Sequence, residues 1–547
     1  MIKRLKITLA VLAVLISKGY ACTNLIVGKA ASTDGSTIVS YSADSYGMFG
    51  YLCSYPRASH AEGEMRPIHD WDTGKYLGKI AEPRVTYNVI GNINEFQVTI
   101  AETTFTGREE LIDTTGIMDY GSLIYVALQR SQTAKEAIQV MTDLVKEYGY
   151  CSGGESFTIA DPSEVWILEM IGKGPGVRGA VWVAVRIPDD CIAAHANQAR
   201  IRHFPLDDKD NCLYSPDVIN FARENGYFKG KKNSEFSFAD AYCPLDFGGR
   251  RYCEARVWSY YNMFVDGMDK YLPYLDGSSD EAMPLYVRPN RKISVRDIQL
   301  AMRDHYEGTP LDITKDLGAG AYAMPYRPSP LSFSVDGEGE YFNERPISTQ
   351  QSAFVFVAQM RDFMYNSIGG VLWFGTDDAN LTVFTPVYCS VPTVPECYSN
   401  RVADAVTFSW NSSFWVFNWV ANMVYPRYSQ MIEDVRERQN QLENEYLAAQ
   451  AGIEEVATKL YAEDPLKAVL FLSEYTNKCA LQAWATWRNL GEYLIVRYND
   501  MVVKQKNTDG TFKRTPEGLC APVERPGYPE SFNRRVVKET GERYKLK

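Results

Sequence analysis

Residues 22–37 read CTNLIVGKAASTDGST. Residues 22–28 are mostly apolar or β-branched, which is typical of a strand, and a second strand is predicted over residues 36–42. Between them, residues 32–35 (STDG) are turn-forming. The stretch therefore predicts a hairpin of two strands that begins at Cys22.

The segment before Cys22 has the three parts of a secretory leader. Its start is basic, residues 7–16 are apolar, and small residues stand at Gly19 and Ala21. The apolar run is too short for a stable transmembrane helix. We expect a signal peptide over residues 1–21, cleavage between Ala21 and Cys22, and export of the mature chain to the periplasm or the outside.

An amino-terminal cysteine has a nucleophile and a base on one residue, because the thiol attacks and the free α-amine takes its proton. Cleavage before Cys22 would create this arrangement. The alternative is a lipoprotein, in which a lipid is attached to Cys22 and the chain is an anchored, non-enzymatic binding protein. Gly19 and Tyr20 depart from the usual lipid-attachment pattern.

The chain has 547 residues and a formal net charge of -11. Such an acidic protein is unsuited to nucleic acid or to an anionic membrane surface, and no later segment has the length and apolarity of a membrane span. Five histidines and the lack of a CxxC pair argue against a zinc site, and we expect no cofactor. Whether copies of the chain form a homo-oligomer stays open.

The chain contains 11 cysteines, and export permits disulfides. Cys389 and Cys397 are close enough in sequence to close a short loop, and Cys243 and Cys253 are spaced similarly. The alternative is that many of these residues are buried free thiols, which pack as small apolar side chains.

The remaining pattern alternates between strands and helices. Strands are predicted over residues 85–90, 97–103, 156–160, 164–170, 180–187, 352–360, 370–374 and 381–388. Helices are predicted within residues 122–148, where Thr133 can cap, and over residues 428–498 with a break at Asp464 and Pro465. Residues 200–345 have a mixed pattern. This order predicts an α+β protein of stacked layers with antiparallel pairing.

Three stretches carry a resemblance to a known family. Residues 22–37, residues 155–169 (ESFTIADPSEVWILE) and residues 370–375 (GVLWFG) resemble the dipeptidase family of N-terminal-nucleophile (Ntn) hydrolases. Secernins are relatives, and choloylglycine hydrolases and penicillin V acylases are more distant ones. The resemblance implies an αββα sandwich of two antiparallel sheets with outer helix layers.

The resemblance also implies a domain organisation. We expect a catalytic domain over residues 22–425, with a mixed insertion around residues 200–345. A helical extension over residues 426–547 is expected to pack on the same domain.

The same resemblance implies site residues around Cys22. Asp44 matches the aspartate that holds the α-amine, Asn94 and Asn197 match positions that form the oxyanion hole, and Arg256 matches an arginine near the nucleophile, where a cation favours thiolate. The alternative for Asp44 and the two asparagines is a turn-forming role.

The chain departs from the family pattern at one place, since relatives carry arginine where this sequence has Tyr41. We expect Arg57 or Arg256 to take over that task. Arg250 and Arg251 compete with Arg256 for its role, and surface placement is the alternative for all three.

Three functions are compatible with these residues. The first is an exported cysteine dipeptidase that hydrolyses small peptides. The second is an amide acylase of the bile-salt or penicillin V type with the same machinery, and the third is the lipid-anchored binding protein. A Cys–His pair with His195 or His203 is a rival mechanism, although a single histidine near a strand end is more often structural.

Overall fold

The computed structural model describes residues 22–546, which form two large antiparallel sheets. The first is seven-stranded, in the order β16-β14-β1-β2-β19-β20-β21. Its strands are β16 (Tyr286–Val287), β14 (Ile192–His195), β1 (Thr23–Val27), β2 (Thr37–Asp44), β19 (Ser352–Met360), β20 (Val371–Thr376) and β21 (Thr385–Tyr388). The predicted hairpin lies at its centre, with Thr23 opposite Ser42.

The second sheet is eight-stranded, in the order β15-β13-β12-β11-β10-β9-β8-β3. Its strands are β15 (Cys212–Tyr214), β13 (Ala180–Ile187), β12 (Val165–Gly172), β11 (Gly154–Ala160), β10 (Thr99–Thr106), β9 (Ile93–Asn94), β8 (Val89–Ile90) and β3 (Ser54–Tyr55). All its neighbouring strands are antiparallel.

The two sheets pack face to face around a buried apolar core. Ile26 and Val39 of the first sheet meet Ala101, Ile167 and Val183 of the second in this core. The opposite face of each sheet carries helices. The interior between the sheets is therefore closed on both sides, and Cys22 belongs to it.

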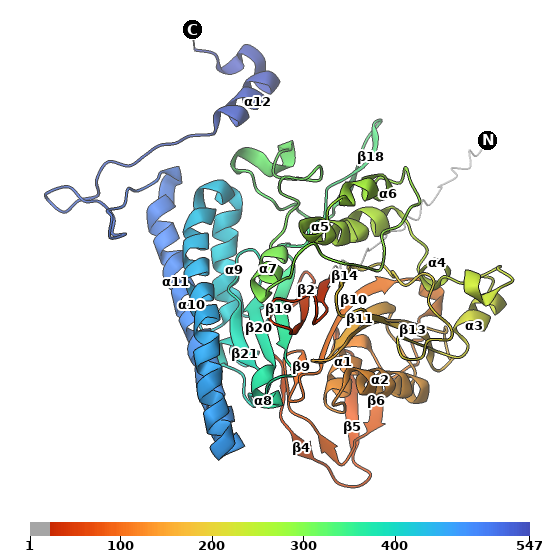
Figure 1. Cartoon of the computed structure of the whole chain (residues 1–547). Helices are drawn as coiled ribbons and strands as arrows, with labels where there is room; N and C mark the ends of the chain where they lie inside the picture. The colour runs from red at the N-terminus through yellow and green to blue at the C-terminus, as the bar shows by residue number, and fades with distance from the viewer. Residues whose placement is uncertain (1–21, 547) are drawn as a thin grey trace, which may run out of the picture.

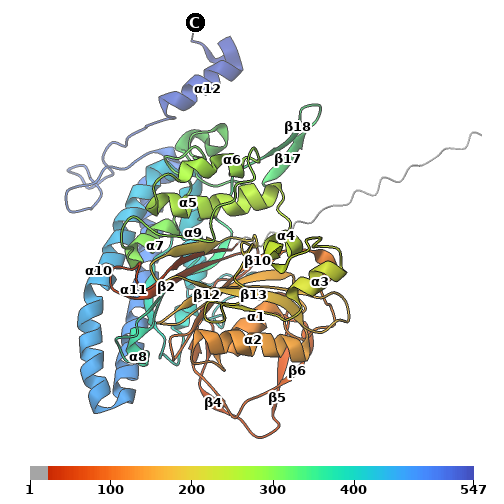
Figure 2. The ribbon, with the colours of Figure 1, turned by 45° about the vertical axis from the view of Figure 1, so that its right-hand side comes forward.

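Helices cover the outer face of each sheet, as Figure 2 shows. The seven-stranded sheet is covered by α5 (Ala255–Phe264), α7 (Val295–Ala301), α9 (Ser413–Val424), α10 (Tyr428–Glu463) and α11 (Pro465–Tyr498). The eight-stranded sheet is covered by α1 (Tyr120–Leu128) and α2 (Ala134–Tyr148). The order of layers is helix, sheet, sheet, helix, which confirms the predicted α+β sandwich.

Smaller elements surround the layers. They are the strands β4 (Ala58–Ser59), β5 (Met65–His69), β6 (Tyr76–Ala81), β7 (Val85–Thr86), β17 (Ser332–Val335) and β18 (Gly339–Phe342), and the helices α3 (Val218–Glu224), α4 (Phe238–Tyr242), α6 (Leu272–Leu275), α8 (Asn366–Gly369) and α12 (Glu530–Thr540). In Figure 1, α12 and the segment before it stand away from the layers.

Most predicted elements are present, and the clearest difference concerns one strand. The strand predicted over residues 85–90 is divided, because β7 pairs with β4 whereas β8 pairs with β3 and β9. The helical stretch over residues 122–148 is two helices, and Thr133 caps the second by accepting a hydrogen bond from Glu136 N at 3.2 Å.

The long helical region breaks where the sequence predicts. Asp464 accepts a hydrogen bond from Leu466 N at 3.0 Å, and Pro465 is the first residue of α11. Because α9 and α10 lie on either side of residue 426 and belong to one layer, the helical region packs directly on the sheet. The domain boundaries themselves stay predictions.

The expected cleavage between Ala21 and Cys22 lies outside the described residues. Within residues 22–546, no helix is both long and apolar enough to cross a membrane. All 11 cysteines are free thiols. Cys243 is contacted by Gln198 Nε2 at 3.2 Å and Cys253 Sγ approaches Asn197 O at 3.5 Å, so the suggested short disulfide between them is not formed.

Candidate active site

Cys22 precedes β1 at the centre of the seven-stranded sheet, and its side chain lies between the two sheets. It is 5% exposed. Its Sγ is 3.7 Å from Tyr41 Oη on the neighbouring strand β2 and 3.6 Å from Glu102 Oε1 on β10 of the facing sheet. The candidate nucleophile is thus held between a phenol and a carboxyl group.

Glu102 belongs to a pair of buried acids that the sequence analysis did not single out. Thr104 is directly opposite Glu155 across β10 and β11, which makes Glu102 and Glu155 diagonal neighbours on one face. Tyr41 Oη donates to Glu102 Oε1 at 2.6 Å, and Thr104 Oγ1 donates to Glu155 Oε1 at 2.7 Å. The sequence does contain one indication of this pair, since each glutamate stands within a strand that is otherwise buried.

The surroundings of Cys22 keep its thiol protonated. Burial raises the pKa of the Cys22 thiol well above its ordinary value, and the charges of Glu102 and Asp44 raise it further. Hydrogen bonds from the Asp44 backbone and the Tyr41 side chain oppose this rise. Attack by the sulfur therefore requires a base that removes the proton as the reaction proceeds.

Asp44 ends β2 beside Cys22, and its carboxylate is fully buried. It accepts hydrogen bonds from Arg345 Nη2 at 2.6 Å, Ser352 Oγ at 2.5 Å and Ser42 Oγ at 3.0 Å. Arg345, which the sequence analysis did not identify, supplies the positive charge that offsets this carboxylate. It lies in the mixed region of the sequence, where no periodic pattern indicated its position.

Arg256, on α5, connects the nucleophile to Asn197. Its Nη1 donates to Cys22 O at 2.6 Å and to Thr23 Oγ1 at 2.8 Å, and its Nη2 donates to Asn197 Oδ1 at 3.0 Å. The guanidinium thus contacts the Cys22 carbonyl. Its competitors pair elsewhere, since Arg250 binds Asp280 and Arg251 binds Glu344.

Asn197 lies two residues beyond β14 with φ +66°, a left-handed conformation that asparagine tolerates. Its Nδ2 donates to Thr104 O at 2.8 Å. The amide nitrogen has a second proton that no hydrogen bond within residues 22–546 uses. Both interpretations of the sequence, a turn residue and an amide donor near Cys22, fit this geometry.

Asn94 has a different environment. Its Nδ2 donates to Leu128 O at 2.7 Å and to Ser131 O at 2.8 Å, while its Oδ1 accepts from Phe96 N and Val98 N, both at 3.0 Å. All of these partners are backbone atoms around a tight turn. These hydrogen bonds fit the alternative in which Asn94 stabilises a turn. Both protons of its side-chain amide are used, so none is left to bind an oxyanion.

The two histidines of the rival mechanism bond to other groups. His195 Nδ1 and Nε2 are each 2.7 Å from a threonine hydroxyl, those of Thr103 and Thr158, and burial lowers the pKa of His195 to about 3. His203 Nδ1 is 2.9 Å from Phe236 O. Neither ring is a hydrogen-bond partner of Cys22 Sγ.

Arg57 does not replace the family arginine, because it is on the surface and pairs with Glu95 at 2.9 Å. Tyr41 itself occupies the place, with its hydroxyl between Cys22 Sγ and Glu102. Where relatives carry a positively charged arginine, this chain therefore has the neutral phenol of Tyr41, which is hydrogen-bonded to Glu102.

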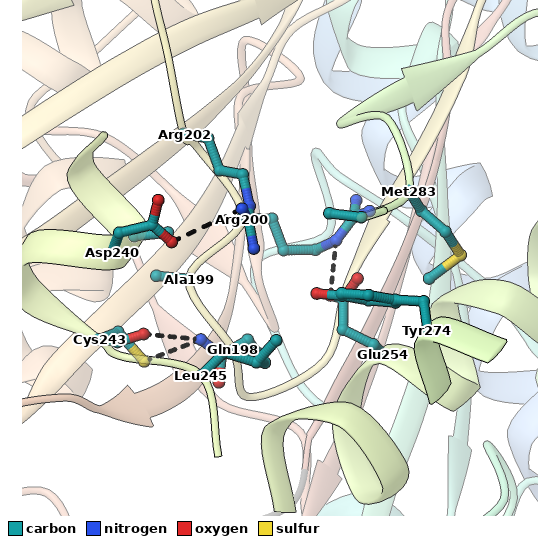
Figure 3. A pocket seen from close by; sticks show the side chains of 12 residues that line it. Gln198, Ala199, Arg200, Arg202, Asp240, Cys243, Leu245, Glu254, Tyr274 and Met283 are labelled. Carbon is teal, nitrogen blue, oxygen red and sulfur yellow. Dashed lines mark hydrogen bonds and ion pairs between the residues drawn. The ribbon is translucent and has the colours of Figure 1, made fainter. Parts of the chain in front are cut away.

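A small pocket begins one residue after Asn197 (Figure 3). Arg200 Nε binds Glu254 at 2.8 Å across it, and Gln198 Nε2 donates to Cys243 O at 2.9 Å. The charged groups of this pocket pair with each other, so none of them is left to bind a substrate. Their contacts hold in place the chain that follows Asn197.

Comparison with known proteins agrees with this arrangement. The model of Peptidase family C69 matches residues 21–54 and 53–441. A probable dipeptidase of Salmonella dublin is 29% identical over 68% of this chain and 81% of its own length. A probable dipeptidase of Latilactobacillus sakei is 26% identical over 75% and 82%, and dipeptidase A of Lactobacillus helveticus is 25% identical over 74% and 82%. The chain belongs to Peptidase family C69 and is a peptidase.

Proposed function

We propose that this peptidase is an exported cysteine dipeptidase of the Ntn class, in which Cys22 Sγ is the nucleophile and the free α-amine of the same residue is the general base. The convergence of groups on Cys22 is the observation that supports it. Arg256 binds the Cys22 carbonyl and Asn197, while Asp44 contacts the sulfur through its backbone. The relatives compared above are named as dipeptidases or probable dipeptidases, which agrees with this substrate class.

In the proposed reaction, the thiol proton passes to the Cys22 α-amine as sulfur attacks the carbonyl carbon of the peptide bond. The carbonyl oxygen becomes an oxyanion, which the second proton of Asn197 Nδ2 stabilises in this scheme. The carbon–nitrogen bond then breaks, and the leaving amine takes the proton from the α-ammonium. A water molecule hydrolyses the thioester, giving its proton to the α-amine and restoring the thiol.

Asp44 and Arg256 act through position in this scheme. The buried Asp44 carboxylate, held by Arg345 at 2.6 Å, places negative charge beside the amino end of β1, where the α-ammonium forms. Arg256 fixes the Cys22 carbonyl at 2.6 Å and so holds in place the backbone of the residue that carries both thiol and amine. We classify both as positioning residues.

Substitution of the nucleophile tests the proposal. We expect Cys22→Ala to reduce dipeptide hydrolysis on the order of 10⁴-fold or more and Cys22→Ser to retain a trace of activity. Cys520→Ala, which changes the exposed cysteine, is the matched control and keeps full activity. Full activity in Cys22→Ala would overturn the proposal.

The substrate class needs a separate assay on the same preparation. Free dipeptides, N-acylated dipeptides, conjugated bile salts and penicillin V are compared side by side. We expect free dipeptides to be preferred. Preference for the acylated or conjugated amides would assign the chain to the acylase alternative, and an inert protein with a lipid on Cys22 would support the anchored binding protein.

A further inference from the structure

The buried acids beside Cys22 have no part in the reaction described above. Glu102 is 2% exposed and Glu155 is 0% exposed. Within residues 22–546, neither forms an ion pair with lysine or arginine, and the Oε2 atom of each has no donor apart from the carboxyl group of the other glutamate. The Tyr150 hydroxyl is also buried without a partner, close enough to both glutamates that they raise its pKa beyond the effect of burial.

Two carboxyl groups in this position are costly unless a cation joins them. Burial raises the pKa of Glu155 well above its ordinary value, and the charge of Glu102 raises it further. Burial also raises the pKa of Glu102. Both shifts favour a proton on the pair. The negative charge that remains belongs to Glu102, whose Oε1 accepts from Tyr41 Oη and Cys22 Sγ, and no lysine or arginine within residues 22–546 pairs with it.

Simple geometry relates this charge to the substrate. In a peptide whose first bond is cleaved, the α-nitrogen is about 2.5 Å from the reacting carbonyl carbon. The carbon approaches the nucleophile to about 3–3.5 Å, and an ammonium binds a carboxylate at about 2.8 Å. An acceptor for the ammonium must thus lie within about 8–9 Å of the sulfur. Glu102 Oε1 meets this limit, because it lies 3.6 Å from Cys22 Sγ.

We infer that Glu102, supported by Glu155, binds the α-ammonium of the residue on the amino side of the cleaved bond and so restricts the enzyme to peptides with a free amino terminus. The inference rests on the proposed function and names the specificity-determining group of that site. Tyr41 holds Glu102 in place through its 2.6 Å hydrogen bond. A substrate with an uncharged acyl chain in the same position would leave the charge of Glu102 without a partner.

Acidic groups also extend from this pair to the surface. Asp72, in the turn between β5 and β6, is exposed, and Tyr120 Oη at the start of α1 donates to its Oδ1 at 2.9 Å. Burial raises the pKa of Tyr120, and the charges of Glu102, Asp72 and Glu155 raise it further, which places Tyr120 near all three. This line of negative charge attracts a cationic amino terminus toward Cys22.

Binding of the ammonium has a consequence for the nucleophile. The charge of Glu102 is one of the causes that raise the pKa of Cys22. A cation at Glu102 offsets that charge, so a substrate with a free amine favours deprotonation of the thiol that attacks it. An uncharged acyl group gives no such assistance.

Two substrates of nearly equal shape test the inference on the unmodified mature enzyme. L-alanyl-L-alanine has an ammonium where N-propionyl-L-alanine has a hydrogen. We expect kcat/KM to be higher for L-alanyl-L-alanine by about 10²-fold or more. Equal values for both would overturn the ammonium site and leave the proposed function standing, whereas absence of turnover for both would overturn the proposed function and this inference with it.

The variant Glu102→Gln separates recognition from a structural role. We expect it to lower kcat/KM for L-alanyl-L-alanine by about 10²-fold, mainly through KM, without lowering kcat/KM for N-propionyl-L-alanine, and to speed alkylation of Cys22 by iodoacetamide. Glu164→Gln, at a partly buried glutamate paired with Arg186, is the control and leaves all three unchanged. An equal loss on both substrates, or slower alkylation, would overturn the inference. Should Glu102→Gln fail to fold, the two-substrate comparison decides.

Discussion

Around Cys22, individual side chains set the chemistry through burial. A neutral thiol, the phenol of Tyr41 and the carboxyl of Glu102 share one interior site, and the hydrogen bonds to Glu102 connect Cys22 and Tyr41 to the facing sheet. The same burial determines the state of His195 on the neighbouring strand β14. Its pKa is lowered to about 3, so the ring is neutral and serves as a hydrogen-bonding bridge between Thr103 and Thr158.

His195 predicts a pH dependence of stability. Its pKa is about 3 when folded, against an ordinary value of 6.5, so between these values the unfolded chain binds a proton that the folded chain does not. Its contribution is therefore complete above about pH 6.5 and is lost as the pH falls toward about 3, by a few kcal/mol in all. We expect His195→Gln to reduce the difference in urea midpoint between pH 7 and pH 4. An unchanged difference would contradict this assignment.

The sequence indicated several residues of the site but not the partners that hold them. Cys22, Asp44, Asn197 and Arg256 come together, as the resemblance to the family implies. Glu102 was missed, since alternation along β10 indicates its face but not which residue of the other sheet opposes it. Arg345 was missed because it lies in the mixed region of the sequence, which has no periodic pattern. Asn94 resembled a functional position, but both protons of its side-chain amide are donated to backbone carbonyls.

At the level of elements, the prediction was most accurate where pattern and capping agree. Strand β19 spans the predicted residues 352–360, and the helical region divides at Asp464, as a capping aspartate before proline requires. The stretch over residues 85–90 was wrong as one strand, because its two halves pair with different partners. Which strands pair with each other depends on the tertiary fold and cannot be predicted from the local sequence pattern.

The link between α10 and the seven-stranded sheet predicts a large effect of one substitution. Glu443 is fully buried and binds Arg303 Nη2 at 2.5 Å, while its Oε1 accepts from Phe384 N at 3.0 Å. Glu443→Gln leaves the Arg303 guanidinium buried without its counter-charge, so we expect a loss of about 3–5 kcal/mol in unfolding free energy, measured by urea denaturation.

An exposed glutamate of the same helix is the control for this prediction. Glu437→Gln changes a side chain that is more than half exposed, and we expect its effect to stay within about 0.5 kcal/mol. Equal effects of the two substitutions would show that the buried ion pair adds nothing to the attachment of α10.

For the whole molecule, the arrangement of layers explains where the site lies. The central hairpin brings the start of β1 to the space between the sheets, helices close both outer faces, and α5 with Arg256 holds the first residues of β1 (Figure 2). A free α-amine at Cys22 would complete this site, because every other group that the proposed reaction uses is already in contact.

The most direct test of this account is the intact mass of the exported protein, taken together with the rate at which the same preparation hydrolyses L-alanyl-L-alanine. We predict a mature chain that begins at an unmodified Cys22, with a rate that rises in proportion to the cleaved fraction. Full activity in a chain that still carries residues before Cys22, or in one with a lipid on Cys22, would contradict the claim that this residue is an amino-terminal nucleophile.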